Sequence, residues 1–151
     1  MVRYRDLLTV RVWAPLSFVF VLTVLLVIDH HASLVGLLAG FREAFQPIIA
    51  LSVSLVIFPF ITVPAVESIV SRAKKLNLYV NPSLVKDYVD ACFTVFIMAL
   101  SEIVLLIVYS FTHKTLIAYT ALATLTTMIL VLFTLMAALW QVTALFYKII
   151  E

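Results

Sequence analysis

Residues 88–111 read YVDACFTVFIMALSEIVLLIVYSF, and this stretch decides the class of fold. Its only charged residues are Asp90, near the start, and Glu102, past the middle. An α-helix needs about 20 apolar residues to cross the hydrocarbon core of a bilayer, and this run is long enough. The alternating segments of about 10 residues that build a membrane β-barrel are absent from the chain. The stretch therefore predicts a transmembrane α-helix.

The composition of the whole chain supports a lipid environment. Hydrophobic residues make up 65% of its 151 residues, and charged residues only 12%. Soluble domains average about 45–50% apolar and about 25% charged residues. A water-soluble fold of this size could not bury so much apolar surface. The net charge of +2 is too small to favour nucleic acid as a partner. The single cysteine, Cys92, excludes an internal disulfide and predicts a small buried hydrophobe.

Charged residues divide the rest of the chain into three further apolar runs. The predicted spans are 12–28, 44–66, 88–111 and 116–147, in one domain over 1–151. The first lies at the lower limit of about 17–25 residues for a span, and the fourth is long enough to tilt or project. The first run also lacks a cleavage site, so we expect a retained helix. The fold class is all-α, an integral membrane four-helix bundle.

Lysine and arginine residues lie mostly on one predicted side of the membrane. Because cytoplasmic segments carry an excess of these residues, both termini are expected to be cytoplasmic. Only Arg42 and Lys114 fall on the opposite side. The eight on the cytoplasmic side are Arg3, Arg5, Arg11, Arg72, Lys74, Lys75, Lys86 and Lys148.

Residues 67–87 form the one sizeable predicted loop. Apolar side chains alternate there with Arg72, Lys74 and Lys75, and Lys86 follows, so the loop suits an anionic membrane surface or a cytoplasmic protein partner. Asn81 reads as an N-cap before a proline, which predicts that the third helix starts near residue 82. On the other side, residues 29–43 are expected to lie against the outer interface.

Glu102 is the most informative single residue. Eleven residues without charge separate it from Asp90, and nine follow it to Phe111. A charge near the bilayer centre costs about 2.5–3.5 kcal/mol on insertion scales, so this carboxyl group must face protein or water and is expected to be neutral unless it is paired. It could serve an ion or proton pathway or a sensing site, or it could clamp helices by hydrogen bonds.

The fourth span offers a companion surface for Glu102. Polar residues recur there at intervals of seven and four, which places them on one helix face. They are Thr120, Thr124, Thr127, Thr134 and Gln141. Such a stripe is typical of a packing seam and also of a pore lining. We expect this stripe to face Glu102, within one chain or across an oligomer.

Other features predict less. Pro59 lies well inside the second span and predicts a kink, which would be static or a gating hinge. Asp29, His30 and His31 favour a solvated interfacial cluster over a metal site. Sequence motifs of phosphate loops, zinc hydrolases and nucleophilic catalysis are missing, so we expect neither an enzyme nor a cofactor.

The run Ala99-Leu100-Ser101-Glu102 resembles a feature of the RexB-like phage-exclusion membrane proteins. They share four spans, a basic cytoplasmic connection and an Ala-Leu-Ser segment followed by a glutamate, here offset by a couple of residues. The ending with Gln141 before Phe146-Tyr147 is similar as well, and the resemblance covers roughly residues 45–151. The four-span membrane subunit of Kiwa-type anti-phage systems has a similar layout. Either resemblance implies a prokaryotic inner-membrane protein that detects infection or depolarises the cell.

The sequence therefore leaves three functions open. The first is an oligomeric inner-membrane sensor or channel-forming effector in anti-phage defence, assembled as a homo-oligomer around a shared polar axis. The second is a structural or accessory subunit of a larger membrane complex. The third is a small proton-coupled transporter that uses Glu102.

Overall fold

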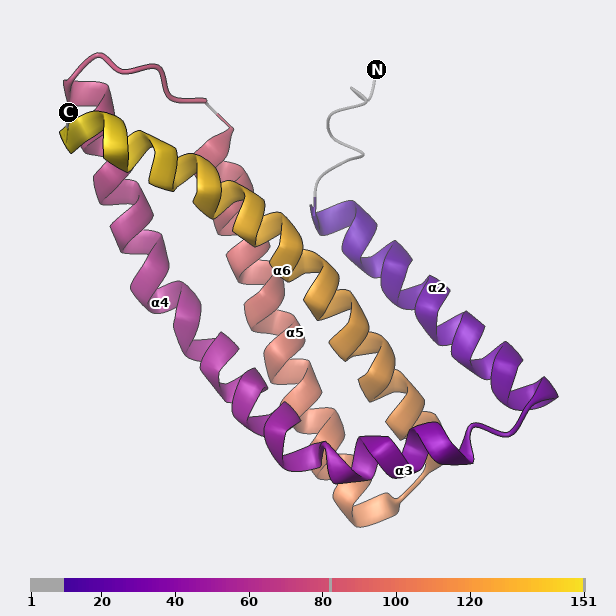
Figure 1. The fold of residues 1–151 in the computed structure, drawn as a ribbon. Coiled ribbons are helices and arrows are strands. Elements are labelled where there is room, and N and C mark those ends of the chain that lie inside the picture. The colour runs from indigo at the N-terminus through magenta and orange to yellow at the C-terminus, as the bar shows by residue number, and fades with distance from the viewer. Residues whose placement is uncertain (1–9, 82, 151) are drawn as a thin grey trace.

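The computed structural model describes residues 10–81 and 83–150, and α-helices account for most of them (Figure 1). The helices are α2 (Val10–His31), α3 (Val35–Glu43), α4 (Phe45–Lys75), α5 (Leu84–Thr112) and α6 (Thr115–Ile150). Four of these, all except α3, are long and apolar enough to cross a membrane. The all-α fold class is confirmed, and the chain is a multi-pass membrane protein. Arg3 and Arg5 lie outside the described residues.

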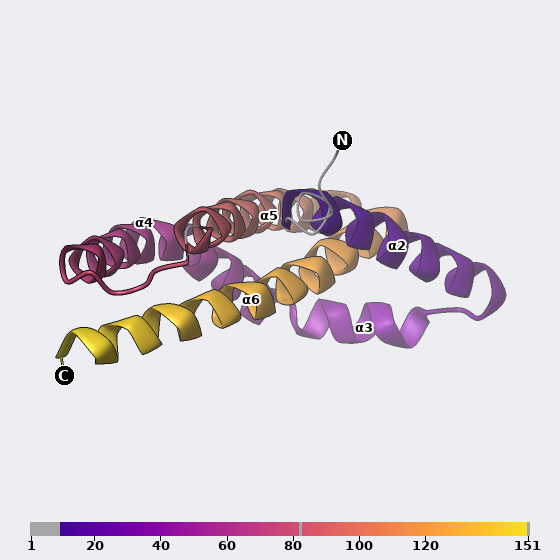
Figure 2. The ribbon, with the colours of Figure 1, turned by 90° about the horizontal axis from the view of Figure 1, so that it is seen from above.

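Helix α5 is the centre of the bundle because it packs against both α4 and α6. Figure 2 shows α6 running diagonally across the layer that α4 and α5 form. The buried face of α5 recurs every three or four residues along its length, as expected for a helix with one face toward protein. It comprises Leu84, Tyr88, Ala91, Cys92, Val95, Ala99, Glu102, Leu106 and Tyr109, and Asp90 is buried as well.

Helix α4 continues to Lys75, so the first part of the predicted 67–87 loop is helical and only residues 76–83 interrupt the helices. The helix ends where Asn77 adopts a left-handed backbone with φ of 56°. The N–H of Leu78 then bonds to the carbonyl of Ala73 at 3.0 Å, and that of Asn77 to Lys74 at 3.1 Å. These two bonds define a Schellman motif, and asparagine tolerates its left-handed position.

Helix α5 begins at Leu84 rather than near residue 82, and Ser83 occupies the capping position. The side-chain oxygen of Asn81 accepts a bond of 3.1 Å from the Ser83 N–H, two residues along the chain. Asparagine commonly folds back in this way to form a turn, so here it precedes the cap instead of being the cap. Pro82 itself lies outside the described residues.

The segment 29–43, expected at the interface, contains the short helix α3. Phe41 is buried against the bundle, whereas Val35 and Leu37 are exposed. Helix α2 is even more open, because Val10 and Ala14 are its only buried residues within the described range. In Figure 1, α2 lies at the edge of the molecule, separated from α4 by α5 and α6.

Six of the eight basic residues predicted to be cytoplasmic lie at one end of the bundle. They are Arg11, Arg72, Lys74, Lys75, Lys86 and Lys148. This basic end holds the start of α2, the end of α4, the start of α5 and the end of α6 (Figure 1). The opposite end, here called the hairpin end, holds α3 and the connection from α5 to α6 at His113 and Lys114. The grouping agrees with the charge pattern from which the topology was predicted.

Candidate functional site

The buried apolar side chains of the bundle form two separate clusters. One cluster lies toward the basic end and includes Leu55, Ala99 and Met128. The other lies toward the hairpin end and includes Ile48, Leu106 and Ala121. A gap in the apolar core therefore falls between these residues on each of α4, α5 and α6.

Polar residues occupy that gap. Four of the five buried polar or charged residues described lie there, and we call them the central polar layer. On α4, Ser52 stands between Ile48 and Leu55; on α5, Glu102 stands between Ala99 and Leu106. On α6, Thr124 and Thr127 stand between Ala121 and Met128. The layer therefore lies at the boundary between the two clusters, which the partly buried Leu125 joins.

An aromatic pair fixes the level of Ser52 relative to Glu102. The rings of Phe60 on α4 and Phe96 on α5 meet edge to face, with centroids 5.7 Å apart. From this pair, Ser52 lies eight residues toward the hairpin end and Glu102 lies six residues toward it. At 1.5 Å per residue, these are rises of about 12 Å and about 9 Å, so the two residues sit at nearly the same level.

The hairpin connection fixes the level of the threonines in the same way. Glu102 precedes the end of α5 at Thr112 by 10 residues, and Thr124 and Thr127 follow the start of α6 at Thr115 by nine and 12. The corresponding rises are about 15 Å, about 14 Å and about 18 Å. Thr124 and Thr127 therefore lie at nearly the level of Glu102, and the expectation that they face it stays a prediction.

Glu102 has no exposed surface, and neither of its carboxyl oxygens has a hydrogen-bond partner among the described residues. The hydroxyl of Ser52 is equally buried and also has no partner there. Buried polar groups are almost always hydrogen-bonded, and leaving one unpaired costs about 1–3 kcal/mol. The layer thus combines a carboxyl group and a hydroxyl group whose bonding capacity is unused.

The threonine hydroxyls donate within their own helix rather than to Glu102. Thr127 donates to the carbonyl of Ala123 at 2.9 Å, and Thr124 to that of Thr120 at 2.9 Å. Threonine in helices often bonds in this way to the preceding turn. Each hydroxyl oxygen nevertheless keeps capacity to accept a bond, so the threonines can receive a proton donor from the carboxyl side.

The polar stripe of α6 does not continue beyond Thr127. Thr120 is half-buried, whereas Thr134 and Gln141 are exposed on the outer side. A seven-residue repeat drifts by about 20° per heptad on a straight helix, so positions 120 to 141 rotate by about 60°. The seam that packs in the C-terminal half is apolar: Met128, Val131, Leu135, Ala138, Val142 and Leu145. The expectation of one continuous stripe is corrected accordingly.

The basic residues predicted to dock a surface or partner lie apart from the polar layer. Arg72, Lys74, Lys75 and Lys86 are all exposed at the basic end. The apolar side of the same stretch is covered, since Val70 and Ala73 are buried in the core. The cations are thus available to a lipid headgroup or a protein partner, together with the exposed side chains of Leu76 and Tyr79.

Helix α4 runs without interruption through Pro59, the predicted kink, and through Pro64. Each proline lacks the N–H that would bond to the carbonyl four residues earlier, that of Leu55 or Phe60. The Leu55 carbonyl lies in the half of α4 toward the hairpin end, and the Phe60 carbonyl lies at the middle of the helix. The position of Pro59 is therefore one where the helix can bend, and the kink stays a prediction.

Sequence reasoning missed two buried polar groups. Ser52 follows Ile48 by four residues and precedes Leu55 by three, a spacing that could have placed it on the buried face of α4. Tyr88 is fully buried near the basic end, and its hydroxyl has no partner among the described residues. Cys92, predicted as a buried hydrophobe, is confirmed as buried one turn further along α5.

Comparison with protein-family models, with curated proteins and with solved structures found no match to this chain. The functional argument therefore depends on the central polar layer.

Proposed function

We propose that this chain is an oligomeric inner-membrane sensor or channel-forming effector, and that the central polar layer is its switch. The observation that supports this is the Glu102 carboxyl group, buried at mid-bundle with no hydrogen-bond partner among the described residues. A group of this kind is costly in a membrane and marks functional sites more often than structural ones. Its position between two apolar clusters makes it a point at which the core can divide.

The proposed switch has a dry state and a wet state. In the dry state the carboxyl group is neutral and enclosed by the helices. Admitting water or a cation to the layer would favour the ionised form, which the closed bundle cannot accommodate because a buried charge is far more costly than a neutral group. A stimulus that favours the separated helices by a few kcal/mol of free energy would thus shift the population from the dry state to the wet state.

The proposed oligomer would use surfaces that lie outside the core. Glu102 faces the interior of its own protomer, so a pore on a shared axis needs the helices to rotate or part. Thr134 and Gln141 already point outward, and α2 is exposed along most of its length. We propose that these surfaces meet a second copy, and that the present arrangement is the resting state. The resemblance noted above favours phage infection as the stimulus.

The test is membrane potential in cells that express the chain, measured with a potential-sensitive dye before and after a phage challenge. Wild-type cells should depolarise after challenge, and cells with Glu102→Gln should not. Glu43→Gln and Glu67→Gln are matched controls, because both glutamates are exposed. Cross-linking in the same membranes should show oligomers in every variant.

Two results would contradict the proposal. If Glu102→Gln depolarised like the wild type, the carboxyl group would not be the switch. If acidification of the cell accompanied uptake of a solute, with no change in potential on challenge, the third option, a proton-coupled transporter, would replace the sensor.

A further inference from the structure

A groove of about 900 Å³ lies between α2, α5 and the start of α6. Its α2 wall includes Ala14, Pro15 and Phe18, and its α5 wall runs from Phe93 to Leu105. This volume falls within the range of about 300–1,000 Å³ that is typical of ligand sites. The groove exists because α2 buries little more than Val10 and Ala14 against the rest of the bundle.

The lining of the groove suits hydrocarbon, although it contains hydroxyl groups. Thr94 and Ser101 donate to the carbonyls of Asp90 and Ile97 at 2.7 Å and 2.9 Å. Thr120 and Thr124, at the far end, likewise donate to their own helix. Because each of these hydroxyl protons is already used, the wall offers no free side-chain donor to a polar ligand.

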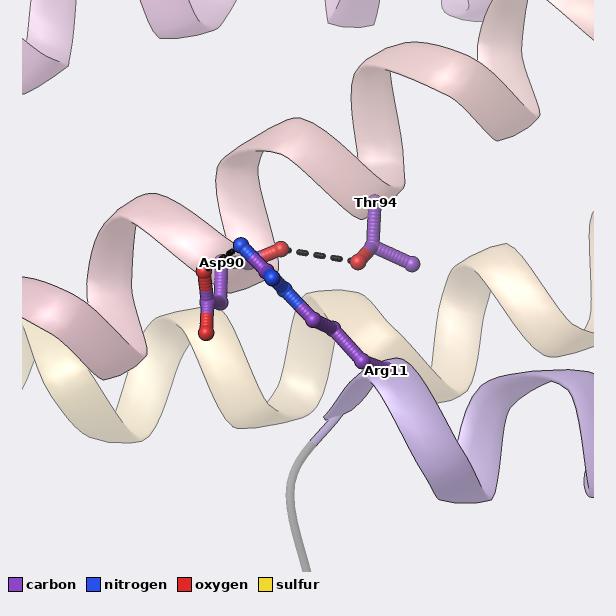
Figure 3. A network of polar contacts seen from close by, with 3 residues as sticks. All are labelled: Arg11, Asp90 and Thr94. Atoms are coloured by element: carbon purple, nitrogen blue, oxygen red, sulfur yellow. Dashed lines mark hydrogen bonds and ion pairs between the residues drawn. The ribbon is translucent and has the colours of Figure 1, made fainter.

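The mouth of the groove is different, because Arg11 lines it. In Figure 3 the Arg11 side chain extends from the first turn of α2 to Asp90 on α5, with Thr94 one turn further along. One guanidinium nitrogen bonds to the Asp90 carboxylate at 2.6 Å, and the Arg11 side chain remains 66% exposed. A guanidinium group has five N–H donors, so most of them stay available to an anion.

The length of the groove matches one leaflet of a bilayer. From Phe93 to Leu105 the α5 wall rises by about 18 Å at 1.5 Å per residue. Half of a hydrocarbon core of about 30 Å is about 15 Å. Arg11 lies in the first turn of α2, a helix long and apolar enough to cross a membrane, so its guanidinium group would meet the lipid headgroups.

We propose that this groove binds a phospholipid, with one acyl chain between α2 and α5 and the phosphodiester on the free N–H groups of Arg11. Apolar walls, a cation at one end only and the length of a single leaflet together fit this amphiphile. The phosphate shares Arg11 with Asp90, so the carboxylate limits the strength of binding. The lipid would fill the space between α2 and α5. The proposal is independent of the function proposed for Glu102.

The experiment measures binding of dioleoyl phosphatidylglycerol to the full chain in an uncharged detergent by native mass spectrometry. The comparison ligands are dioleoylglycerol, which has the same chains without phosphate, and glycerol phosphate, which has no chains. Because charge-assisted contacts to phosphate are strong, the phospholipid should bind at least about tenfold more tightly than either. Equal binding of dioleoylglycerol would overturn the role of Arg11.

Variants separate the groove from a general effect of the membrane surface. Ser101→Trp should fill the groove and weaken binding by about tenfold or more. Ser54→Trp is the matched control, since Ser54 is also exposed and donates to the carbonyl four residues earlier, but on α4 away from the groove. Undiminished binding to Ser101→Trp, with an unchanged melting temperature, would overturn the site.

The ion pair provides a second comparison. Arg11→Gln should reduce the preference for phosphatidylglycerol over dioleoylglycerol to nearly none, whereas Asp90→Asn should preserve or raise it because Arg11 loses its competitor. If the ion pair served only to hold α2 in place, both variants would lose the lipid equally, and the phosphate contact would be wrong.

Discussion

The Nε–H of Arg42 donates a hydrogen bond of 3.0 Å to the hydroxyl of Tyr109, and this bond ties the end of α3 to the end of α5. The Phe41 and Tyr109 rings meet edge to face beside it, at 5.7 Å between centroids. At the basic end, Arg11 and Asp90 join α2 to α5 in a similar way. Two arginine contacts thus fasten the N-terminal segment to the central helix, one at each end.

Removing the Tyr109 hydroxyl should loosen α3 without unfolding the bundle. Tyr109→Phe keeps the ring that packs on Phe41 but deletes the acceptor for Arg42, which should lower the free energy of unfolding by about 1 kcal/mol. Hydrogen exchange of the α3 amides should become faster. Tyr147→Phe is the control, since Tyr147 is exposed on α6. Unchanged exchange in α3 would show that the bond contributes nothing to its position.

The end of α4 depends on the left-handed conformation of Asn77, with φ of 56°. Asn77→Gly should preserve stability, because glycine adopts this conformation freely. Asn77→Val should lower the free energy of unfolding by about 1–2 kcal/mol, because a Cβ clashes with the carbonyl there and a branched one most of all. Thermal unfolding in detergent would measure both. Equal melting temperatures of the Asn77→Gly and Asn77→Val variants would mean that the turn rearranges to accommodate valine.

The number of spans could be read from the sequence because charged residues bracket each apolar run. The ends of the helices could not, since Glu67 and Arg72 stop a hydrophobic run without stopping a helix, and the Schellman turn at Asn77 stops the helix instead. Helix α3 was not predicted because Gly36 and Gly40 disfavour a helix in this apolar segment. The helix is stabilised by the packing of Phe41.

The candidate site was predicted in part. The sequence singled out Glu102 and the threonines of the fourth span, and the short hairpin between α5 and α6 puts Thr124 and Thr127 at nearly the level of Glu102. The outward positions of Thr134 and Gln141 did not, because they depend on the drift of a seven-residue repeat and on the diagonal course of α6 (Figure 2). Ser52 was missed because its spacing from Ile48 and Leu55 fits the buried face of α4 but does not show that a serine there would lack a partner.

Replacing the carboxyl group by a hydrocarbon should stabilise the bundle and abolish the response. Glu102→Leu removes an unpaired polar group that costs about 1–3 kcal/mol and fills similar space, so the melting temperature in detergent should rise. Depolarisation after challenge should be lost at the same time. The exposed Glu67→Leu should change neither property. A fall in melting temperature with Glu102→Leu would show that the carboxyl group is a structural clamp.

The Thr127 hydroxyl should matter little to stability. It donates to Ala123 within α6, and valine has nearly the same shape, so Thr127→Val should change the free energy of unfolding by less than about 1 kcal/mol. Thr134→Val, on the exposed side of the same helix, is the control for the change in composition. A much larger loss at Thr127 would indicate that its oxygen accepts a bond from the Glu102 side.

A double-mutant cycle tests whether Ser52 and Glu102 act as a pair. Both are fully buried, both lack partners among the described residues, and the Phe60–Phe96 contact puts them at nearly one level. The described structure has no bond between them, so a bond forms only if one of the two side chains rotates. In that case Ser52→Ala and Glu102→Gln should be non-additive by about 0.6 kcal/mol, the average for interhelical bonds in membranes. Thermal unfolding of both single variants and the double variant measures this coupling.

The control cycle replaces Ser52 by Ser54, whose hydroxyl already donates to Ala50 and faces away from the core. Ser54→Ala should add to Glu102→Gln without coupling, because residues that share no partner behave independently. Additivity in both cycles would mean that Ser52 and Glu102 do not bond to each other at rest and that each acts in the layer independently.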